Sequence, residues 1–154
     1  KNKNKRKLDE TDIKILKALQ KDSRESASHI AEEVNVSVPT VTERIRKLQE
    51  NGVILGFQTA IDPSSIGLDV SAIITIISGS SQYYKEVTVA AEKTPEVVQC
   101  FSTTGNGSHM LYIVTKNSNT LEELLRKIQS WPGVARTETQ IVLSSYKPGS
   151  TIPL

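Results

Sequence analysis

The sequence predicts an α+β protein with an N-terminal helix-turn-helix (winged-helix-like) domain over residues 1–61 and a C-terminal ferredoxin-like βαββαβ domain over residues 62–154. Three short amphipathic helices with good capping residues occupy the first third of the chain. A break of Asp, Pro and Ser begins at Asp62. After that break, β-forming and helical segments follow each other in the order βαββαβ.

The first two helices are predicted from their caps and from apolar residues at helical spacing. Asp9 is placed to cap the first helix, and acidic residues follow it in the first turn, where the helix dipole favours them. Ser26 is placed to cap a short second helix. The apolar positions are Ile13, Ile15, Leu16 and Leu19 in the first helix and Ile30, Ala31 and Val34 in the second.

A third helix is predicted to begin at Ser37 and to end near Glu50. Ser37 is a favourable N-cap, and Pro39 lies in the first turn, where its missing N–H is not needed. Asn51–Gly52 is expected to end the helix in a left-handed conformation. Since only residues 35–37 separate it from the second helix, the pair forms a helix-turn-helix pattern. Residues 53–61 are predicted as β structure, a small wing followed by a connecting strand.

The C-terminal domain has its own pattern of elements. The predicted elements are a strand over 70–77, a helix over 82–93, a strand over 97–103, a glycine turn over 105–108, a strand over 109–115, a helix capped by Asn119 or Thr120, and a strand over 134–145. Isoleucines fall on both faces of the strand over 70–77, so neither face is clearly suited to water. We therefore expect two copies to pair through their sheets. Residues 147–154 are expected to form a loosely packed tail.

The basic surplus of the chain lies in its first third. Residues 1–52 contain 12 Lys and Arg against 9 Asp and Glu, whereas residues 53–154 contain 7 against 8. Five of the first seven residues are basic, and two interpretations of them stay open, a solvated tail or an arm near a polyanion.

The third helix carries the candidate DNA-binding residues. If Val41, Ile45 and Leu48 face the core, the opposite face presents small hydroxyls and long cations, which suit phosphates and guanine edges in a major groove. Glu43 has two interpretations, acceptance from a cytosine amino group or pairing with Lys47. A solvated amphipathic helix is the alternative for the whole face. The predicted DNA-binding residues are Ser37, Val38, Pro39, Thr40, Thr42, Glu43, Arg44, Arg46 and Lys47.

Two stretches of this third resemble one known family. Residues 8–16 with 21–24, and residues 36–48 with 52–54, are similar to the opening and the recognition helix of the leucine-responsive/AsnC-type (Lrp/AsnC, feast/famine) regulators. The resemblance implies operator binding to double-stranded DNA and a homodimer formed by the C-terminal sheets. It also implies further assembly into tetramers or octamers and, in many members, modulation by an amino acid or other small metabolite.

In that family, a turn between the second and third strands of the C-terminal domain contributes to the effector pocket. It commonly reads Gly-Asp-aromatic-Asp, but both acidic positions are neutral here. The glycines are equally explained by a tight hairpin. The residues that the resemblance assigns to an effector are Thr104, Gly105, Asn106, Gly107, Ser108 and His109.

The remaining features argue against other classes of protein. Cys100 is the single cysteine, so a disulfide framework or cysteine metal site within one chain is excluded. No apolar run reaches the roughly 18 residues of a membrane span, and no signal-peptide core is present, so a cytoplasmic location is expected. His29, His109 and Cys100 form no evident catalytic group, and no enzyme, metal or cofactor is predicted. A metabolite-binding assembly module acting through protein partners is the alternative function.

Overall fold

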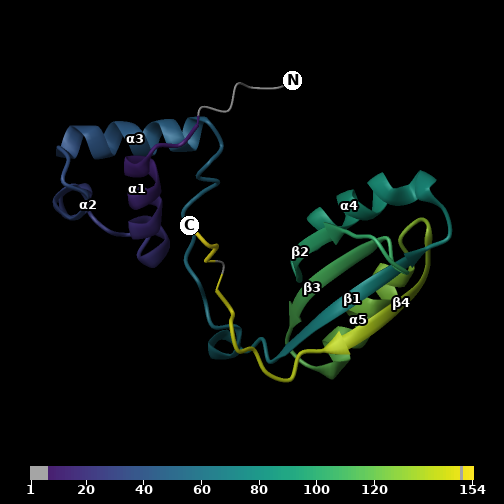
Figure 1. Cartoon of the computed structure of the whole chain (residues 1–154). Coiled ribbons are helices and arrows are strands. Elements are labelled where there is room, and N and C mark those ends of the chain that lie inside the picture. The colour runs from purple at the N-terminus through teal and green to yellow at the C-terminus, as the bar shows by residue number, and fades with distance from the viewer. Residues whose placement is uncertain (1–6, 150) are drawn as a thin grey trace. The chain divides into compact units, whose positions relative to one another are not determined.

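The computed structural model describes residues 7–149 and 151–154 (Figure 1). Their contacts form two compact units, one containing the chain up to Ala60 together with Pro148–Leu154, the other Ile61–Lys147. The predicted assignment of all of 62–154 to the second domain thus differs from this grouping at the C-terminal end. The basic residues Lys1 to Arg6, predicted as a possible arm, lie outside the described residues.

Three helices form the first unit, and their caps are the predicted ones. They are α1 Glu10–Lys21, α2 Ala27–Val34 and α3 Val38–Glu50. Asp9 and Asp12 form a reciprocal capping box, in which the Asp9 carboxylate accepts from the Asp12 N–H at 2.8 Å. Ser26 and Ser37 each accept a backbone N–H in the first turn of their helices. The core residues are Ile15, Ala18, Leu19, Ile30, Ala31, Val41 and Leu48.

The ends of α2 and α3 set the geometry of the helix-turn-helix. Asn35 adopts a left-handed conformation with φ of 60°, so that the chain reverses within the three-residue turn. Gly52 has φ of 71° and ends α3 as predicted. The N–H groups of Val53 and Ile54 then donate to the Leu48 carbonyl, which folds the chain back on the end of α3.

The predicted wing and connecting strand over 53–61 do not form within one described chain. This segment pairs with no described strand, and its residues 55–61 are exposed. The β-forming residues that suggested a strand are exposed instead; Leu55 is 95% exposed and Ile61 64%. β propensity describes a fit to a pleated, half-buried surface, and this segment has no such surface beside it in one chain.

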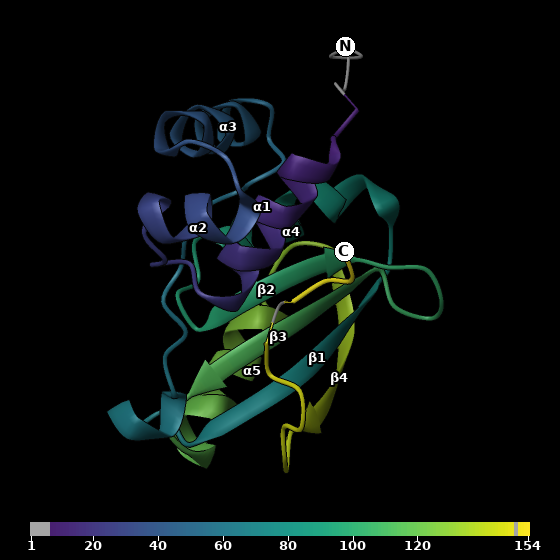
Figure 2. The same cartoon turned by 60° about the vertical axis from the view of Figure 1, so that its left-hand side comes forward.

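The second unit is a four-stranded antiparallel sheet covered on one face by two helices. Its elements are β1 Val70–Ser78, α4 Tyr84–Glu92, β2 Val97–Ser102, β3 His109–Thr115, α5 Ser118–Gln129 and β4 Val134–Ile141. The strand order is β2-β3-β1-β4, and both helices lie behind the sheet in Figure 2. The ferredoxin-like prediction is confirmed. None of the described helices is long and apolar enough to cross a membrane.

Three details of the second unit differ from the prediction. Asn117 caps α5 in place of Asn119 or Thr120; its Oδ1 accepts the Thr120 N–H at 2.9 Å, and Thr120 Oγ1 accepts from the Asn117 N–H. A 3₁₀ turn occupies Ser81–Tyr83, so α4 begins only at Tyr84. The last strand ends at Ile141, which lies opposite Ala72 of β1, and not at Ser145 as predicted.

The core of the second unit lies between the sheet and the helices. Ala72, Ile74 and Ile76 of β1 are fully buried there, whereas the alternate residues of β1 face the side of the sheet that no helix covers. The C-terminal tail packs against the first unit. The Gln20 side-chain amide donates to the Ile152 carbonyl at 3.0 Å and accepts from the Ile152 N–H at 2.9 Å.

Candidate nucleic-acid interface

The start of α3 is exposed and carries small polar groups. Ser37, Val38 and Pro39 are all exposed, and Ser37 Oγ lies 2.7 Å from Thr40 Oγ1. No acidic residue occupies the first turn, so the positive end of the helix dipole is not neutralised there. Thr42, one turn further, is exposed and donates to the Val38 carbonyl at 3.2 Å. The N–H and hydroxyl groups at this end of α3 can donate hydrogen bonds to phosphate oxygens, and its side chains can approach base edges.

The cations in the second half of α3 are held by neighbouring carboxylates. Arg46 donates twice to Glu43, at 2.9 and 2.6 Å, and also pairs with Glu50. Lys47 Nζ lies 3.6 Å from Glu43 Oε1. The hydrogen bonds from Arg46 lower the pKa of Glu43 to about 2, so that Glu43 is ionised at neutral pH. The predicted Glu43–Lys47 pair is present, and these four side chains have no net charge together.

Arg44 points toward α1 and not into solvent. Its guanidinium pairs with Asp9 and with Asp12, the second at 3.1 Å. Asp12 is buried, with 6% of its surface exposed. Hydrogen bonds to Asp9 and Asp12 raise the pKa of Arg44, and the same contact with Arg44 lowers the pKa of Asp9. Of the nine predicted DNA-binding residues, Arg44 therefore positions α3 on α1. No single-helix pattern could reveal this contact, because its partners are more than thirty residues away.

The predicted effector turn is divided by the fold into an exposed and a buried half. Thr104, Gly105 and Asn106 are exposed, and Gly105 has φ of 100°. Gly107 lies against β1, where a Cβ atom would come within 2.4 Å of Thr75 Cγ2. The glycine at this position thus allows the turn to pack on the neighbouring strand.

Ser108 and His109 point into the second unit. Ser108 Oγ lies 2.5 Å from Ser78 Oγ and 2.7 Å from His109 Nδ1, and the Ser108 N–H donates to the Ile76 carbonyl at 2.8 Å. The Tyr84 ring meets the His109 ring edge to face, with centroids 5.1 Å apart. His109 is 1% exposed, and this burial lowers its pKa. The turn can therefore offer a ligand only Thr104, Asn106 and backbone groups without rearranging.

Burial of His109 predicts a loss of stability on acidification. Its pKa in the folded protein lies below the value of about 6.5 in the unfolded chain, so the unfolded chain takes up the proton first. Stability should therefore fall as pH drops below about 6.5, with a slope of at most about 1.4 kcal/mol per pH unit. Urea unfolding between about pH 7.5 and 5.5 should show a shallower dependence for His109→Gln than for the wild type.

His29 provides the control for this measurement because its shift has the opposite sign. A hydrogen bond to Glu25 raises the pKa of His29, so its contribution to stability is present at low pH and is lost as pH rises through the folded-state value. His29→Gln should therefore steepen the acid-side loss. An unchanged pH dependence in His109→Gln would show that the imidazole is solvated.

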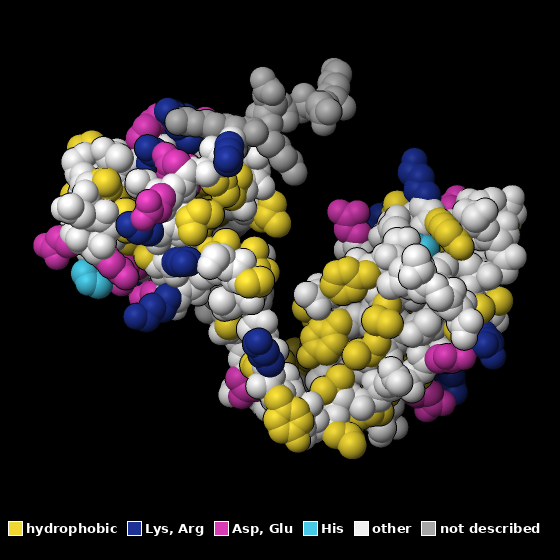
Figure 3. All heavy atoms as spheres, in the orientation of Figure 1, with side chains coloured by type: hydrophobic (Ala, Val, Ile, Leu, Met, Phe, Trp, Pro, Cys, Tyr) yellow, Lys and Arg dark blue, Asp and Glu magenta, His cyan; other side chains and the backbone are white. Residues whose placement is uncertain are grey.

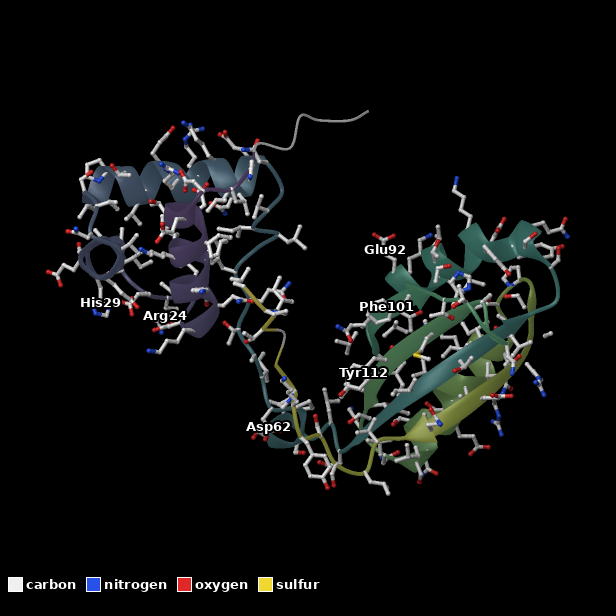
Figure 4. The ribbon with its side chains drawn as sticks, in the orientation of Figure 1. Arg24, His29, Asp62, Glu92, Phe101 and Tyr112 are labelled. Carbon is white, nitrogen blue, oxygen red and sulfur yellow. The ribbon has the colours of Figure 1, made fainter. Side chains whose placement is uncertain are left out.

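The side of the sheet away from the helices carries exposed apolar side chains. In the β-sheet register, Phe101 lies opposite Met110 and Ile73 lies opposite Tyr112. We name these four residues the open sheet face. Phe101 is 51% exposed, and hydrophobic side chains gather over the strands in Figure 3. Figure 4 shows Phe101 and Tyr112 on the neighbouring strands β2 and β3. Only the β1 part of this face could be predicted from the sequence, because the pairing of β2 with β3 brings the rest together.

The described residues contain no group of three or more His, Cys, Asp or Glu side chains that could hold a metal ion. Cys100 lies in β2 among the core residues, and burial raises the pKa of its thiol. A thiol that stays protonated at neutral pH is a poor nucleophile. This residue is therefore a packing residue of the sheet.

Family models match both parts of the chain. Residues 8–54 match a winged helix-turn-helix DNA-binding model, and residues 70–152 match the Lrp/AsnC ligand binding domain. The first match contains the exposed start of α3 and the contacts of Arg44. The second contains the sheet, the turn and the open sheet face.

Individual relatives agree over almost the whole length. An HTH-type transcriptional regulator of Pyrococcus horikoshii is 40% identical over 147 residues, covering 96% of this chain and 97% of its own. The regulatory protein AsnC of Haemophilus influenzae is 35% identical, covering 92% and 98%. Among solved structures, Escherichia coli AsnC has a TM-score of 0.83 at 30% identity, covering 91% and 95%. A Neisseria meningitidis transcriptional regulator in complex with L-methionine has a TM-score of 0.89 at 27% identity, covering 96% and 97%.

Proposed function

The chain belongs to the Lrp/AsnC family of DNA-binding transcription regulators, and we propose that it binds its operator through the N-terminal half of α3 as a symmetric homodimer. The observation that carries this proposal is the exposed, hydroxyl-rich start of α3, which has no acidic residue in its first turn. Because the family consists of transcription regulators and not enzymes, the prediction that the chain is no enzyme is confirmed.

The first half of α3 is suited to direct contact with the duplex. In helix-turn-helix proteins, residues near the start of the second helix reach base edges in the major groove. Thr40 and Thr42 can hydrogen-bond to bases or phosphates, and the exposed Val38 side chain can contact a thymine methyl group. Phosphate oxygens are also favoured at the positive end of the helix dipole.

The paired cations of α3 bind DNA by exchanging one anion for another. Arg46 is held by Glu43 and Glu50 in the free protein, and a phosphate or a guanine edge replaces one of these carboxylates in the complex. The exchange lowers the net contribution of Arg46 to the free energy of DNA binding. It also disfavours weak contacts, because these cannot displace a carboxylate. Glu43, released from Arg46, becomes free to accept from a cytosine amino group.

The open sheet face supports assembly of two copies. A sheet with helices on one side leaves its other side to water unless a second layer covers it, and this face carries Phe101, Met110 and Tyr112. A second copy covers this face by the same residues around a twofold axis, and the symmetry places two copies of α3 on two half-sites. We propose that tetramers or octamers are built from these dimers, in line with the family resemblance.

A protein-partner module is the rival function, and the surface of α3 favours DNA over it. A protein-binding helix would present apolar anchors, whereas Thr40, Thr42, Glu43, Arg46 and Lys47 are polar. Salt dependence separates the two functions. DNA binding releases counterions, so the affinity should fall steeply between about 50 and 200 mM salt.

We also propose that a small metabolite modulates DNA binding through the turn over 104–109. The Neisseria meningitidis relative was solved as a complex with L-methionine, which supports an amino acid as the class of effector. In this chain the turn has neutral residues at the two family acidic positions, and Ser108 and His109 are already paired within the unit. The turn is therefore suited to the carboxylate of an effector, through backbone N–H groups, more than to its ammonium group.

Replacing Arg46 with alanine tests the DNA-binding proposal. On a duplex selected from a random pool, Arg46→Ala should weaken binding by about 5- to 150-fold, the effect of losing one good base or phosphate contact. Part of this loss of affinity should come from repulsion between the DNA and the Glu43 carboxylate, which Arg46 no longer neutralises. The measurement is a fluorescence-anisotropy titration at several salt concentrations, in which the salt slope should fall by about one.

Arg126 offers a matched control. It is an exposed arginine on α5 that pairs with Glu122 four residues earlier, as Arg46 pairs with Glu43 three residues earlier. Arg126→Ala should leave DNA affinity unchanged, and Thr40→Ala should weaken it. If Arg46→Ala and Thr40→Ala both bind like the wild type while the dimer persists, α3 does not face the duplex in this way.

A further inference from the structure

A cavity of about 330 Å³ opens in the second unit at the end of β3 opposite to the turn. Its polar lining consists of Glu96, Thr115, Lys116, Thr120, Glu123 and Lys127. The turn precedes His109 at the start of β3, and Thr115 is its last residue. A seven-residue strand is about 20 Å long, so the cavity and the turn are separate places on the same unit.

The four charged residues around this cavity are balanced in sign, and none forms an ion pair with another described residue. Helix α5 shows the contrast directly. Glu122 and Arg126 pair along its surface at 2.6 Å, whereas Glu123 and Lys127, one residue further and equally four apart, do not pair. The charges that line the cavity thus keep their hydrogen-bonding capacity for another molecule.

Among the residues of this cavity, Glu96 most specifically indicates a bound ligand. Its Oε2 is buried and accepts no hydrogen bond from any described residue. A buried carboxylate oxygen without a donor is unfavourable, and such groups are rare in folded proteins. The nearby hydroxyls do not serve it, because Thr115 donates to Thr120 Oγ1 at 2.7 Å and Thr120 donates to the Asn117 carbonyl at 3.0 Å.

We propose that this cavity binds a small zwitterion, a molecule with one ammonium and one carboxylate group close together. The ammonium group would donate to Glu96, with Glu123 beside it, and the carboxylate would accept from Lys116 and Lys127. A simple anion would leave both glutamates without a partner, and a simple cation would leave both lysines without a partner. Leu68 and Leu124 complete the lining and offer apolar contact to a short side chain.

The size of the cavity limits the ligand. A volume of about 330 Å³ lies at the low end of the range of about 300–1,000 Å³ for small-molecule pockets. This space is large enough for a free amino acid or a molecule of similar size. The inference goes beyond the proposed function, because it uses no residue of α3 and none of the turn.

Calorimetric titration of the full chain without DNA tests the proposal. The probes are the twenty common L-amino acids, each tested singly. For every amino acid that binds, the corresponding amine without the carboxylate and the acid without the amine are tested as well. We expect at least one amino acid to bind and both of its single-charge analogues to bind at least about tenfold more weakly, the effect of losing one charge-assisted contact.

Variants locate the site. Glu96→Gln and Lys127→Met should each weaken binding at least about tenfold, and Lys127 is exposed on α5, so that variant is expected to fold. The matched controls, Glu122→Gln and Arg126→Met on the same helix, should bind like the wild type. Circular dichroism checks the fold of each variant.

Three results would overturn the proposal. The first is that none of the twenty amino acids binds. The second is that a bound amino acid and its deaminated acid bind equally well, which would show a plain anion site. The third is that binding survives in both Glu96→Gln and Lys127→Met but is lost in a Thr104→Ala/Asn106→Ala variant, which would place the ligand at the turn. DNA binding enters none of these measurements, so their failure leaves the proposed operator contact untouched.

Discussion

Ile73→Asp is expected to convert the proposed homodimer into a folded monomer and to lower DNA affinity by about 10²–10⁴-fold. Ile73 belongs to the open sheet face and lies on β1 opposite Tyr112. In a symmetric interface the substitution appears twice. Two carboxylates would then be removed from water without a cation nearby, which costs several kcal/mol for each ion.

The lower DNA affinity is expected because the monomer no longer holds two recognition helices together. In a dimer, binding of the first α3 brings the second to its half-site at high effective concentration. A monomer has only one contact, so the affinity for a full operator falls toward that for a half-site. Sedimentation velocity gives the oligomeric state, and anisotropy on full and half operators gives the two affinities.

Val89→Asp is the matched control for Ile73→Asp. Val89 is an exposed apolar residue on α4, on the helical side of the unit, and 38% of its surface is exposed. This variant should remain dimeric and bind the full operator. A dimeric Ile73→Asp protein would contradict the proposed interface, and a monomeric one that binds full operator as tightly as wild type would contradict the link between assembly and DNA binding.

Ile30→Ala is expected to unfold the first unit while leaving the second folded. Ile30 is fully buried in a small core, which has seven buried members among the described residues. Removing a buried isoleucine side chain costs about 2–5 kcal/mol. A domain of this size is marginally stable, so a loss of that magnitude takes most of its stability. DNA binding should therefore be abolished or nearly so at physiological temperature.

The fluorescence of Trp131 reports on the folding of the second unit separately from the first. Trp131 is the single tryptophan of the chain, and it is buried in the core of the second unit. In Ile30→Ala, the helical circular dichroism signal should melt in two steps, and only the upper step should coincide with the change in Trp131 fluorescence. Sedimentation velocity should still show a dimer, because the open sheet face is intact.

Ile66→Ala serves as the control for this substitution. Ile66 is 63% exposed, and surface substitutions usually change stability by no more than about 0.5 kcal/mol. One melting step with coincident circular dichroism and fluorescence in Ile30→Ala would show that the two units fold as one cooperative body. In that case the loss of DNA binding would no longer report on the first unit alone.

Short-range interactions made much of this fold predictable from sequence. The caps at Asp9, Ser26 and Ser37 and the left-handed end at Gly52 depend on residues within one helical turn. The alternation along β1 depends on the two-residue period of a strand. Hence the helix-turn-helix and the βαββαβ order of the second unit were correctly predicted, whereas the burial of one face of β1 was not.

Contacts between residues distant in sequence decided the rest. Arg44 looked like a flanking DNA contact but binds Asp9 and Asp12. Residues 53–61 have β propensity but no strand partner among the described residues of the chain. Ser108 and His109 of the predicted effector turn point inward to Ser78 and Tyr84. Sequence alone determined the helices of the first unit and the strands and helices of the second, because local hydrogen bonding and periodicity are properties of neighbouring residues. Only the tertiary structure decided which side chains remain available to ligands, because burial and ion pairing depend on what the fold brings alongside them.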